Sequence, residues 1–237
     1  MLEIAVFNIA SALAAEKAGA DRIELCENPY DGGTTPSYGT LKIAKEKIKI
    51  PVFPIIRPRG GDFLYSEIEF EIMQKDISLC KELGFEGVVI GLLQVDGNID
   101  EIRTKALVDL AYPMEVTFHR AFDRAINPLV SLETIISCGC QRILSSGQTP
   151  NAWDGKDLIK QLIEQAQDRI IIMPGSGIRS NHIKEMVAFT GAIEIHSSAR
   201  KSSPSLMTFQ QNSMDEKLEN IQVDADEIRK MKQLITA

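Results

Sequence analysis

The chain lacks a long hydrophobic segment and an excess of positive charge. No run of about 18 apolar residues occurs, which is the length that a membrane-spanning helix needs. The first residues also lack the basic and then apolar pattern of a signal peptide. The formal net charge of -7 argues against non-specific binding to nucleic acid or anionic membranes, which needs a basic surface. We therefore expect a cytoplasmic protein that binds neither nucleic acid nor membrane.

Cysteine is scarce, with 4 residues in a chain of 237. In a cytosolic protein these thiols are expected to be reduced. Cys138 and Cys140 form a C-x-C pair, which can hold a soft metal such as Cu(I). The alternative is that both pack as small apolar side chains, which their position between a predicted helix and a predicted strand favours.

Hydrophobic residues make up 44% of the sequence, and they occur in short runs separated by segments of helical periodicity. The predicted strands are residues 2–7, 22–25, 52–56, 87–90, 114–118, 141–144, 170–173 and 192–195. Eight strands alternating with helices predict an α/β fold of the (β/α)8 TIM-barrel type, with residues 1–237 in a single domain. The alternative is a doubly wound open sheet, which would normally have a glycine-rich turn after its first strand. Residues 8–11 contain no such glycines.

Residues 200–224 differ in composition from the rest of the chain because they are rich in Ser, Gln and Asn. They separate the eighth predicted strand from a last predicted helix over residues 226–235. We expect a long loop on the active face of the barrel. The alternative is a disordered excursion.

The third predicted strand ends in a dense cluster of charge, in the sequence IIRPRGGDF over residues 55–63. A buried strand that delivers Arg57 and Arg59 to its C-terminal end is costly unless an anion lies there. Gly60 and Gly61 permit a tight turn and a close approach of the backbone to a ligand. Active sites of these barrels lie at the C-terminal ends of the strands. We therefore expect Arg57 and Arg59 to hold a small anion.

The alternation of side chains along the strands predicts a polar cup at this face. Its expected members are Glu24, Arg57, His119 and His196. The alternative is a set of internal ion pairs that only fill the barrel. Four glutamates interrupt otherwise apolar strands, and each needs a partner when buried: Glu3, Glu24, Glu115 and Glu194. Arg57 and Arg59 are the expected partners, with His119 and His196.

The loops after the seventh and eighth strands combine glycine with short hydroxyl side chains. Gly175 and Gly177 follow the seventh strand, and His196, Ser197 and Ser198 follow the eighth. Loops at these two positions often bind phosphate through backbone N–H groups and hydroxyls. We expect these residues to help Arg57 bind the anion. The alternative is that the two glycines only permit a tight turn.

His119 is one of 3 histidines, and Arg120 and Asp123 follow it closely. A histidine at a strand end can act as a general acid or base near neutral pH. Together with Glu24 it would form the acid/base pair of an enzyme acting on a small phosphorylated or carboxylated metabolite. The alternative is a structural histidine, with Asp123 capping the next helix.

Several motifs resemble the CutC family, the copper homeostasis proteins. They include residues 19–26 (GADRIELC), 55–63 and 116–123 (VTFHRAFD). Shorter likenesses lie at residues 32–37, 145–148 and 196–199. The resemblance extends over about residues 2 to 200. It implies a TIM barrel, a cytoplasmic protein with a role in copper homeostasis and copper binding, and a homodimer.

The resemblance also implies a candidate metal ligand. Cu(I) prefers thiolate or thioether ligands, and Cys26 matches a cysteine that the family carries after the second strand. Some relatives have a further cysteine where this chain has Ala5, so a paired-thiolate site would lack one ligand. Two interpretations therefore remain open, a copper-binding protein and an enzyme that acts on a small anionic metabolite.

Overall fold

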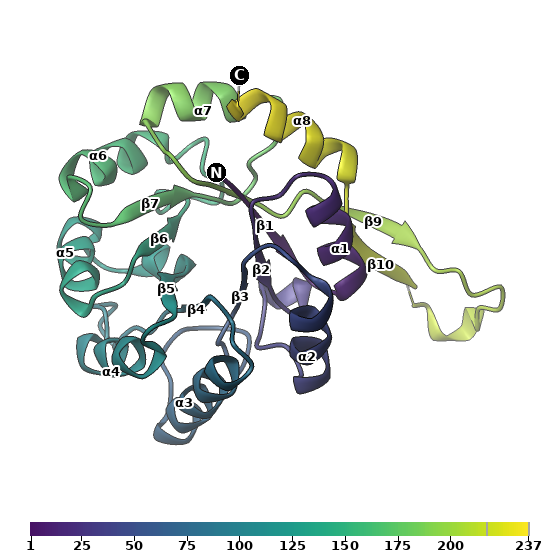
Figure 1. The fold of residues 1–237 in the computed structure, drawn as a ribbon, viewed down its shortest axis with the longest axis horizontal. Helices are drawn as coiled ribbons and strands as arrows, with labels where there is room; N and C mark the ends of the chain where they lie inside the picture. Colours follow the sequence, from purple (N-terminus) through teal and green to yellow (C-terminus); the bar gives the residue numbers. More distant parts are fainter. Residues whose placement is uncertain (217, 237) are drawn as a thin grey trace.

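Eight parallel strands surrounded by helices form the body of the molecule (Figure 1). The computed structural model describes residues 1–216 and 218–236. The strands are β1 (Leu2–Val6), β2 (Arg22–Leu25), β3 (Val52–Pro54), β4 (Gly87–Ile90), β5 (Glu115–Phe118), β6 (Arg142–Ser145), β7 (Ile171–Pro174) and β8 (Ile195–Ser197). The helices are α1 (Ile9–Lys17), α2 (Tyr38–Lys47), α3 (Glu67–Glu82), α4 (Glu101–Ala111), α5 (Pro128–Cys138), α6 (Lys156–Ala166), α7 (Ile183–Thr190) and α8 (Ala225–Thr236). Among the described residues, none of these helices is both long and apolar enough to cross a membrane.

The strands follow one another in barrel order. One sheet has the order β3-β2-β1-β8 and the other β4-β5-β6-β7, and all of these pairings are parallel. A bridge between Ile55 and Val89 joins the two sheets, with the Ile56 amide donating to the Val89 carbonyl at 2.8 Å. Between the described residues of β7 and β8 no ladder forms. The predicted (β/α)8 TIM-barrel fold is thus confirmed, with one seam open.

Side-chain alternation divides each strand between two environments. Along β1, Leu2, Ile4 and Val6 are fully buried in the apolar layer beneath the helices. Glu3 and Ala5 have the opposite phase and face the barrel interior. The interior is therefore where the polar residues of the strands gather, and its C-terminal end is the place for a site.

Local signals in the sequence set the ends of the helices. Ser66 and Glu69 form a reciprocal capping box at the start of α3, and the Asn8 side chain accepts from the Ser11 amide at the start of α1. Gly139 ends α5 with a positive φ of 87°, a conformation that glycine adopts without a steric penalty. Short connections of this kind hold the strand ends at fixed positions.

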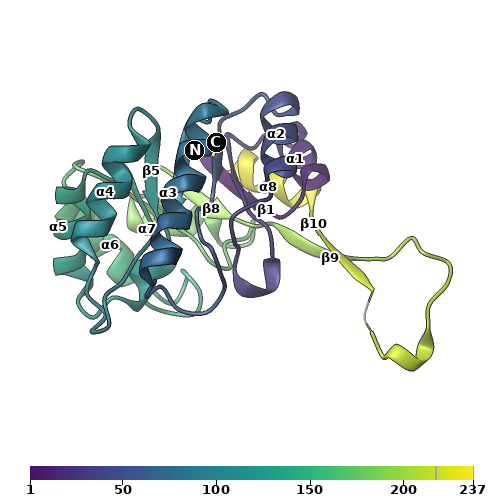
Figure 2. The same ribbon diagram turned by 90° about the horizontal axis from the view of Figure 1, so that it is seen from below.

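Residues 200–216 and 218–223 form a projecting arm. The strands β9 (Arg200–Pro204) and β10 (Glu219–Val223) pair in antiparallel fashion and carry the connecting segment away from the barrel (Figure 2). The loop predicted over residues 200–224 is therefore wrong in conformation. β9 is polar on both faces, and β10 has apolar residues only at Ile221 and Val223, so the apolar alternation by which a strand is recognised in a sequence is too short to stand out.

Candidate functional site

A chain of ion pairs spans the interior at the N-terminal ends of the strands. Arg22 pairs with Glu3 and, at 2.6 Å, with Glu194. Arg142 contacts Glu194 at 2.8 Å and Glu115 at 2.5 Å. Both arginines also lie over the ring of Phe53. These charges compensate one another, and the side chains that carry them fill the interior at the N-terminal end of the barrel.

Of the expected partners of the strand glutamates, Arg57 and Arg59 were therefore wrong. His196 does contact Glu3 and Glu24, whereas His119 forms no ion pair among the described residues. Arg22 and Arg142 begin their strands, and Arg22 lies in register beside Glu3. Arg57 follows the C-terminal end of β3, at the opposite end of the barrel. The inference from residue type missed this difference in height along the barrel axis.

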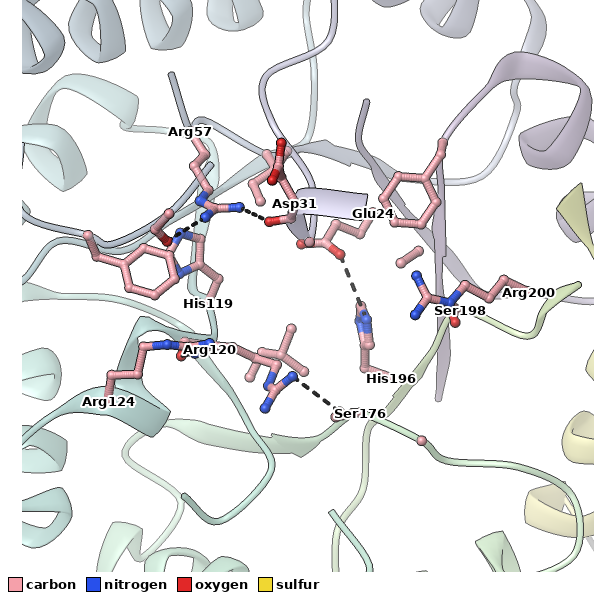
Figure 3. Close-up of a pocket in the computed structure, with 18 residues that line it drawn as sticks. Glu24, Asp31, Arg57, His119, Arg120, Arg124, Ser176, His196, Ser198 and Arg200 are labelled. Atoms are coloured by element: carbon pink, nitrogen blue, oxygen red, sulfur yellow. Dashed lines mark hydrogen bonds and ion pairs between the residues drawn. The ribbon is translucent and has the colours of Figure 1, made fainter. Parts of the chain in front are cut away.

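A cavity of about 280 Å³ opens at the C-terminal ends of the strands (Figure 3). The structure brings together all four residues of the expected cup in its lining. The charged and imidazole residues that line it are Glu24, Asp31, Arg57, His119, Arg120, Arg124, His196 and Arg200. The cavity therefore contains four guanidinium groups, one from the end of β3, two from the turn after β5 and one from the start of β9.

Arg57 is buried, and its guanidinium group binds backbone carbonyls. Nη1 donates to Asp31 at 2.6 Å and to Gly33 at 2.8 Å, while Nη2 donates to Gly61 at 2.9 Å. The guanidinium carbon lies 5.0 Å from the centre of the Phe63 ring. No carboxylate among the described residues pairs with this cation. These bonds hold its orientation but leave its charge uncompensated.

Arg59 lies apart from the cavity. It forms ion pairs with Glu69 at 2.5 Å and Asp62 at 2.9 Å, and it stacks over Tyr65. The residues that line the cavity do not include it. Pro58 and the turn at Gly60 interrupt the strand alternation, so the phase shared by Arg57 and Arg59 in the sequence does not continue in space.

His119 presents a neutral imidazole to the site. Its Nδ1 accepts a hydrogen bond from the Ala121 amide at 3.1 Å, so Nε2 is the nitrogen that carries the proton. Nε2 is buried and has no partner among the described residues. Burial, together with the charge of Arg57, lowers the pKa of His119 to about 3. Gly91 packs against the ring, since a Cβ there would lie 2.3 Å from it.

Glu24, His196 and Glu3 form a second buried group. His196 Nδ1 lies 2.8 Å from Glu3 Oε1, and Nε2 lies 3.8 Å from Glu24 Oε2. Burial opposes the charge on Glu3, but its hydrogen bond with His196 and the nearby Arg22 lower its pKa to about 2. Burial raises the pKa of Glu24 to about 7, although the charge of His196 acts in the opposite direction. Burial also works against protonated His196, yet its bond to Glu3 raises its pKa.

The loops after β7 and β8 contribute only part of the predicted set. Gly177 and Ser198 line the cavity, as does Ser176. Ser197 donates its hydroxyl to the Ile178 carbonyl at 2.7 Å and accepts from the Ala199 amide at 3.1 Å, so it holds the loop instead. Gly175 lies against Leu144 and His196, where a side chain would not fit.

Three cavity arginines were absent from the predicted ligand set. Arg120 is held by Asp123 at 2.8 Å and donates to Ser176 Oγ at 3.1 Å. Arg120 and Arg124 lie on a short 3-10 helix, Arg120–Arg124, that follows β5, and Arg200 begins the arm. The position of Arg120 directly after His119 was a usable signal, whereas nothing in the sequence brings Arg200 to this cavity.

The cysteines do not form a thiolate cage. Cys26 is buried beside Glu24, and burial followed by that carboxyl raises the pKa of its thiol well above its ordinary value. Ala5, on the neighbouring strand, adds no ligand. Cys138 and Cys140 are buried at the end of α5, and burial raises the pKa of Cys138 to about 11. Cys26 has no second thiol beside it among the described residues, since Cys80, Cys138 and Cys140 lie on α3 or at the end of α5, so the cavity does not offer the paired thiolates that suit Cu(I).

Replacing Glu24 should change how stability depends on pH. Between its ordinary pKa of 4.5 and about 7, Glu24 is ionised in the unfolded chain but protonated in the folded one. The free energy of unfolding should therefore fall as pH rises through this window, by about 3 kcal/mol. Glu24→Gln should remove most of this fall in urea titrations at pH 5 and pH 8. The exposed Glu71→Gln is the control, and an unchanged pH dependence in Glu24→Gln would contradict the assignment.

Comparisons with known proteins agree with the motifs. A model described as the CutC family matches residues 1–201. The copper homeostasis protein cutC homolog of Mus musculus is 48% identical over 90% of this chain and 79% of its own length. The Homo sapiens homolog is 47% identical over 90% of this chain and 78% of its own.

Solved structures agree as well. The crystal structure of CutC from Streptococcus agalactiae is 33% identical, covers 84% of this chain and 98% of its own, and has a TM-score of 0.80. Phosphoribosylanthranilate isomerase from Thermotoga maritima has a TM-score of 0.61 at 14% identity, covering 99% of this chain and 98% of its own, which shows the fold alone. Because the family model spans most of the sequence and the mouse and human relatives approach half identity, the chain belongs to the CutC family.

Proposed function

We propose that the chain shares the role in copper homeostasis for which its mouse and human relatives are named, as a cytoplasmic protein, and that it acts through a small anionic ligand bound in the barrel cavity. The relatives' names support the role. The chemistry of the cavity supports the ligand class. Phosphorylated and carboxylated metabolites both fit this description.

The observation that carries this proposal is positive charge without compensation. Arg57, Arg124 and Arg200 line the cavity, and none of them has a carboxylate partner among the described residues. The whole chain, by contrast, has a net charge of -7. Arg57 is buried, so its uncompensated charge is costly and an anion bound beside it would be stabilised. The exposed Arg124 and Arg200 add positive charge at the mouth of the cavity.

The size and lining of the cavity favour a small ligand. About 280 Å³ is near the lower end of the range for metabolite sites. Ser176 and Ser198 add hydroxyl groups, and Gly177 adds backbone without a side chain. Arginine is well suited to carboxylate and phosphate because its N–H groups match the spacing of their oxygens.

Direct copper binding by the barrel has weaker support. Cys26 is the one thiol near the cavity among the described residues, and its raised pKa keeps it in the protonated form that binds metals poorly. Glu24 and His196 are harder ligands than Cu(I) prefers. A role in copper homeostasis therefore does not require that the barrel itself hold the ion.

Removing one cavity arginine should weaken anion binding. Arg124→Met retains an apolar contact for Phe63 but loses the charge. We expect the dissociation constants of small phosphorylated and carboxylated metabolites to rise about tenfold, as one charge-assisted contact is lost. A thermal-shift screen identifies the ligands, and calorimetry measures the constants. Arg229→Met removes the same charge from the exposed face of α8 and is the control. Equal weakening in both variants, or no stabilisation of wild type by any anion, would overturn the proposal.

Copper titration separates the two ligand classes. In a Cu(I) competition assay with a chromogenic chelator, wild type and Cys26→Ala should bind equally, because a buried, protonated thiol contributes little affinity. Cys80→Ala, which alters a buried thiol in α3, is the matched control. A tight site that disappears only in Cys26→Ala would favour the copper-binding interpretation instead.

We further propose that the chain is a homodimer in which the arm contacts the second copy. The tip exposes large apolar side chains, with Leu206 96%, Phe209 68%, Met207 67% and Met214 60% exposed. Apolar clusters of this kind usually mark interaction surfaces. Leu206→Ser combined with Phe209→Ser should halve the mass measured by light scattering. Val95→Ser, at a side chain 88% exposed elsewhere, should not, and a monomeric wild type would refute the dimer.

A further inference from the structure

Glu24 differs from the other three strand glutamates in its partners. Glu3, Glu115 and Glu194 are each bound by Arg22 or Arg142. Among the described residues, Glu24 forms no ion pair with any arginine, and its one charged neighbour at contact distance is His196. It also lines the cavity. Glu24 takes no part in the ion pairs with Arg22 and Arg142, so neutralising those arginines does not account for its burial.

His119 supplies a complementary group on the same cavity. Figure 3 shows His119 beside Arg57, with Glu24 and His196 on another side of the cavity. The bond from the Ala121 amide to Nδ1 makes Nε2 a hydrogen-bond donor, and this donor has no partner among the described residues. An orphaned buried donor normally signals a missing acceptor. A ligand oxygen would satisfy it.

We propose that the cavity catalyses proton transfer at the carbon next to the carbonyl group of a small anionic carbonyl compound, with Glu24 as the base and the Nε2–H group of His119 as the donor to the carbonyl oxygen. This inference rests on the proposed anion site. The arginines would hold the phosphate or carboxylate group, which positions the rest of the substrate between Glu24 and His119.

The step balances without any other reactant. Glu24 takes the proton as the C–H bond breaks, and the electron pair of that bond forms a carbon–carbon double bond. The carbonyl electron pair moves to the oxygen, where His119 stabilises the developing charge. Glu24 then returns the proton to the same carbon as the oxygen electron pair re-forms the carbonyl group, so the net result is exchange of that hydrogen. Where the deprotonated carbon itself bears a hydroxyl group, Glu24 can instead return the proton to the former carbonyl carbon while the hydroxyl proton moves to the former carbonyl oxygen, which gives an isomer.

The environments of the two groups suit these roles. A base works best when its pKa lies near the working pH, and burial brings the pKa of Glu24 to about 7. His119, with its pKa lowered to about 3 by burial and by Arg57, remains neutral and keeps its N–H as a donor. A preorganised donor in a water-poor site stabilises an oxyanion more strongly than water does.

His196 and Glu3 act as positioning residues in this arrangement. Glu3 holds Nδ1 of His196 at 2.8 Å, so that Nε2 faces Glu24 at 3.8 Å. The titratable and charged groups around Glu24 are His196, Glu3, Cys26 and Arg22. His196 favours the ionised form of Glu24, while Glu3 opposes it. Replacing His196 should therefore move the pH dependence of the reaction to higher pH.

The experiment measures hydrogen exchange at carbon. Purified protein is incubated in D₂O with dihydroxyacetone phosphate or pyruvate, and loss of the C–H signal is followed by proton NMR. We expect wild type to accelerate exchange at least 100-fold over solution for a probe that binds, as general base catalysis does. The rate should rise with pH through about 7, as Glu24 loses its proton.

Variants assign the roles. Glu24→Gln should lose at least 100-fold of the exchange rate while still binding the probe. His119→Phe should lose at least tenfold, since one oxyanion donor is gone. His196→Asn should shift the pH profile upward. Glu71→Gln, on the exposed face of α3, should leave the rate unchanged.

Each outcome separates this inference from the anion site. If a probe stabilises wild type in thermal shift but does not exchange, the proton-transfer inference is wrong and the anion site stands. Exchange by Glu24→Gln at the wild-type rate would also reject Glu24 as the base. If neither probe binds at all, the anion site fails for these substrates, and the inference drawn from it fails too.

Discussion

The ion-pair layer at the N-terminal end of the barrel is the constraint on which the site depends. Ion pairs in this layer join strands that are distant in sequence; its members are Glu3, Arg22, Glu194, Arg142 and Glu115. Such a cluster is weak evidence for stability, because desolvation of the ions offsets their attraction. It does fix geometry, because Glu3 is held by Arg22 on one side and binds His196 on the other. The orientation of His196, and through it the surroundings of Glu24, follows from this layer.

Charge is arranged oppositely at the two ends of the interior. At the N-terminal end every arginine meets carboxylates, whereas at the mouth Arg57, Arg124 and Arg200 meet none among the described residues. An acidic protein that concentrates guanidinium groups in one cavity attracts anions there and repels them elsewhere. This contrast explains why the motif over residues 55–63 is a poor copper site. Guanidinium groups repel metal cations, and they bind carboxylates and phosphates well.

Much of the fold and part of the site could be predicted from the sequence, for identifiable reasons. Strand and helix periodicities and helix stop signals are local, so the eight-stranded barrel could be recognised. Side-chain alternation within single strands predicted that Glu24, His119 and His196 lie at one cavity, and all three line it. It failed for Arg59, where Pro58 and Gly60 change the direction of the chain. It also could not show that Arg22 and Arg142 lie at the height of the buried glutamates, or that the polar segment after β8 pairs with itself. These features depend on contacts between distant segments.

The arm has a consequence for the cavity because Arg200 belongs to both. Arg200 is the first residue of β9, pairs in register with Val223 of β10, and lines the cavity with its side chain. Its carbonyl accepts from Arg179, and the Asp224 amide donates to the neighbouring Ala199 carbonyl at 2.7 Å. The base of the hairpin and one wall of the cavity thus share Arg200. A displacement of β9 would therefore also displace a guanidinium group that lines the cavity, so the arm and the cavity are coupled through this one residue.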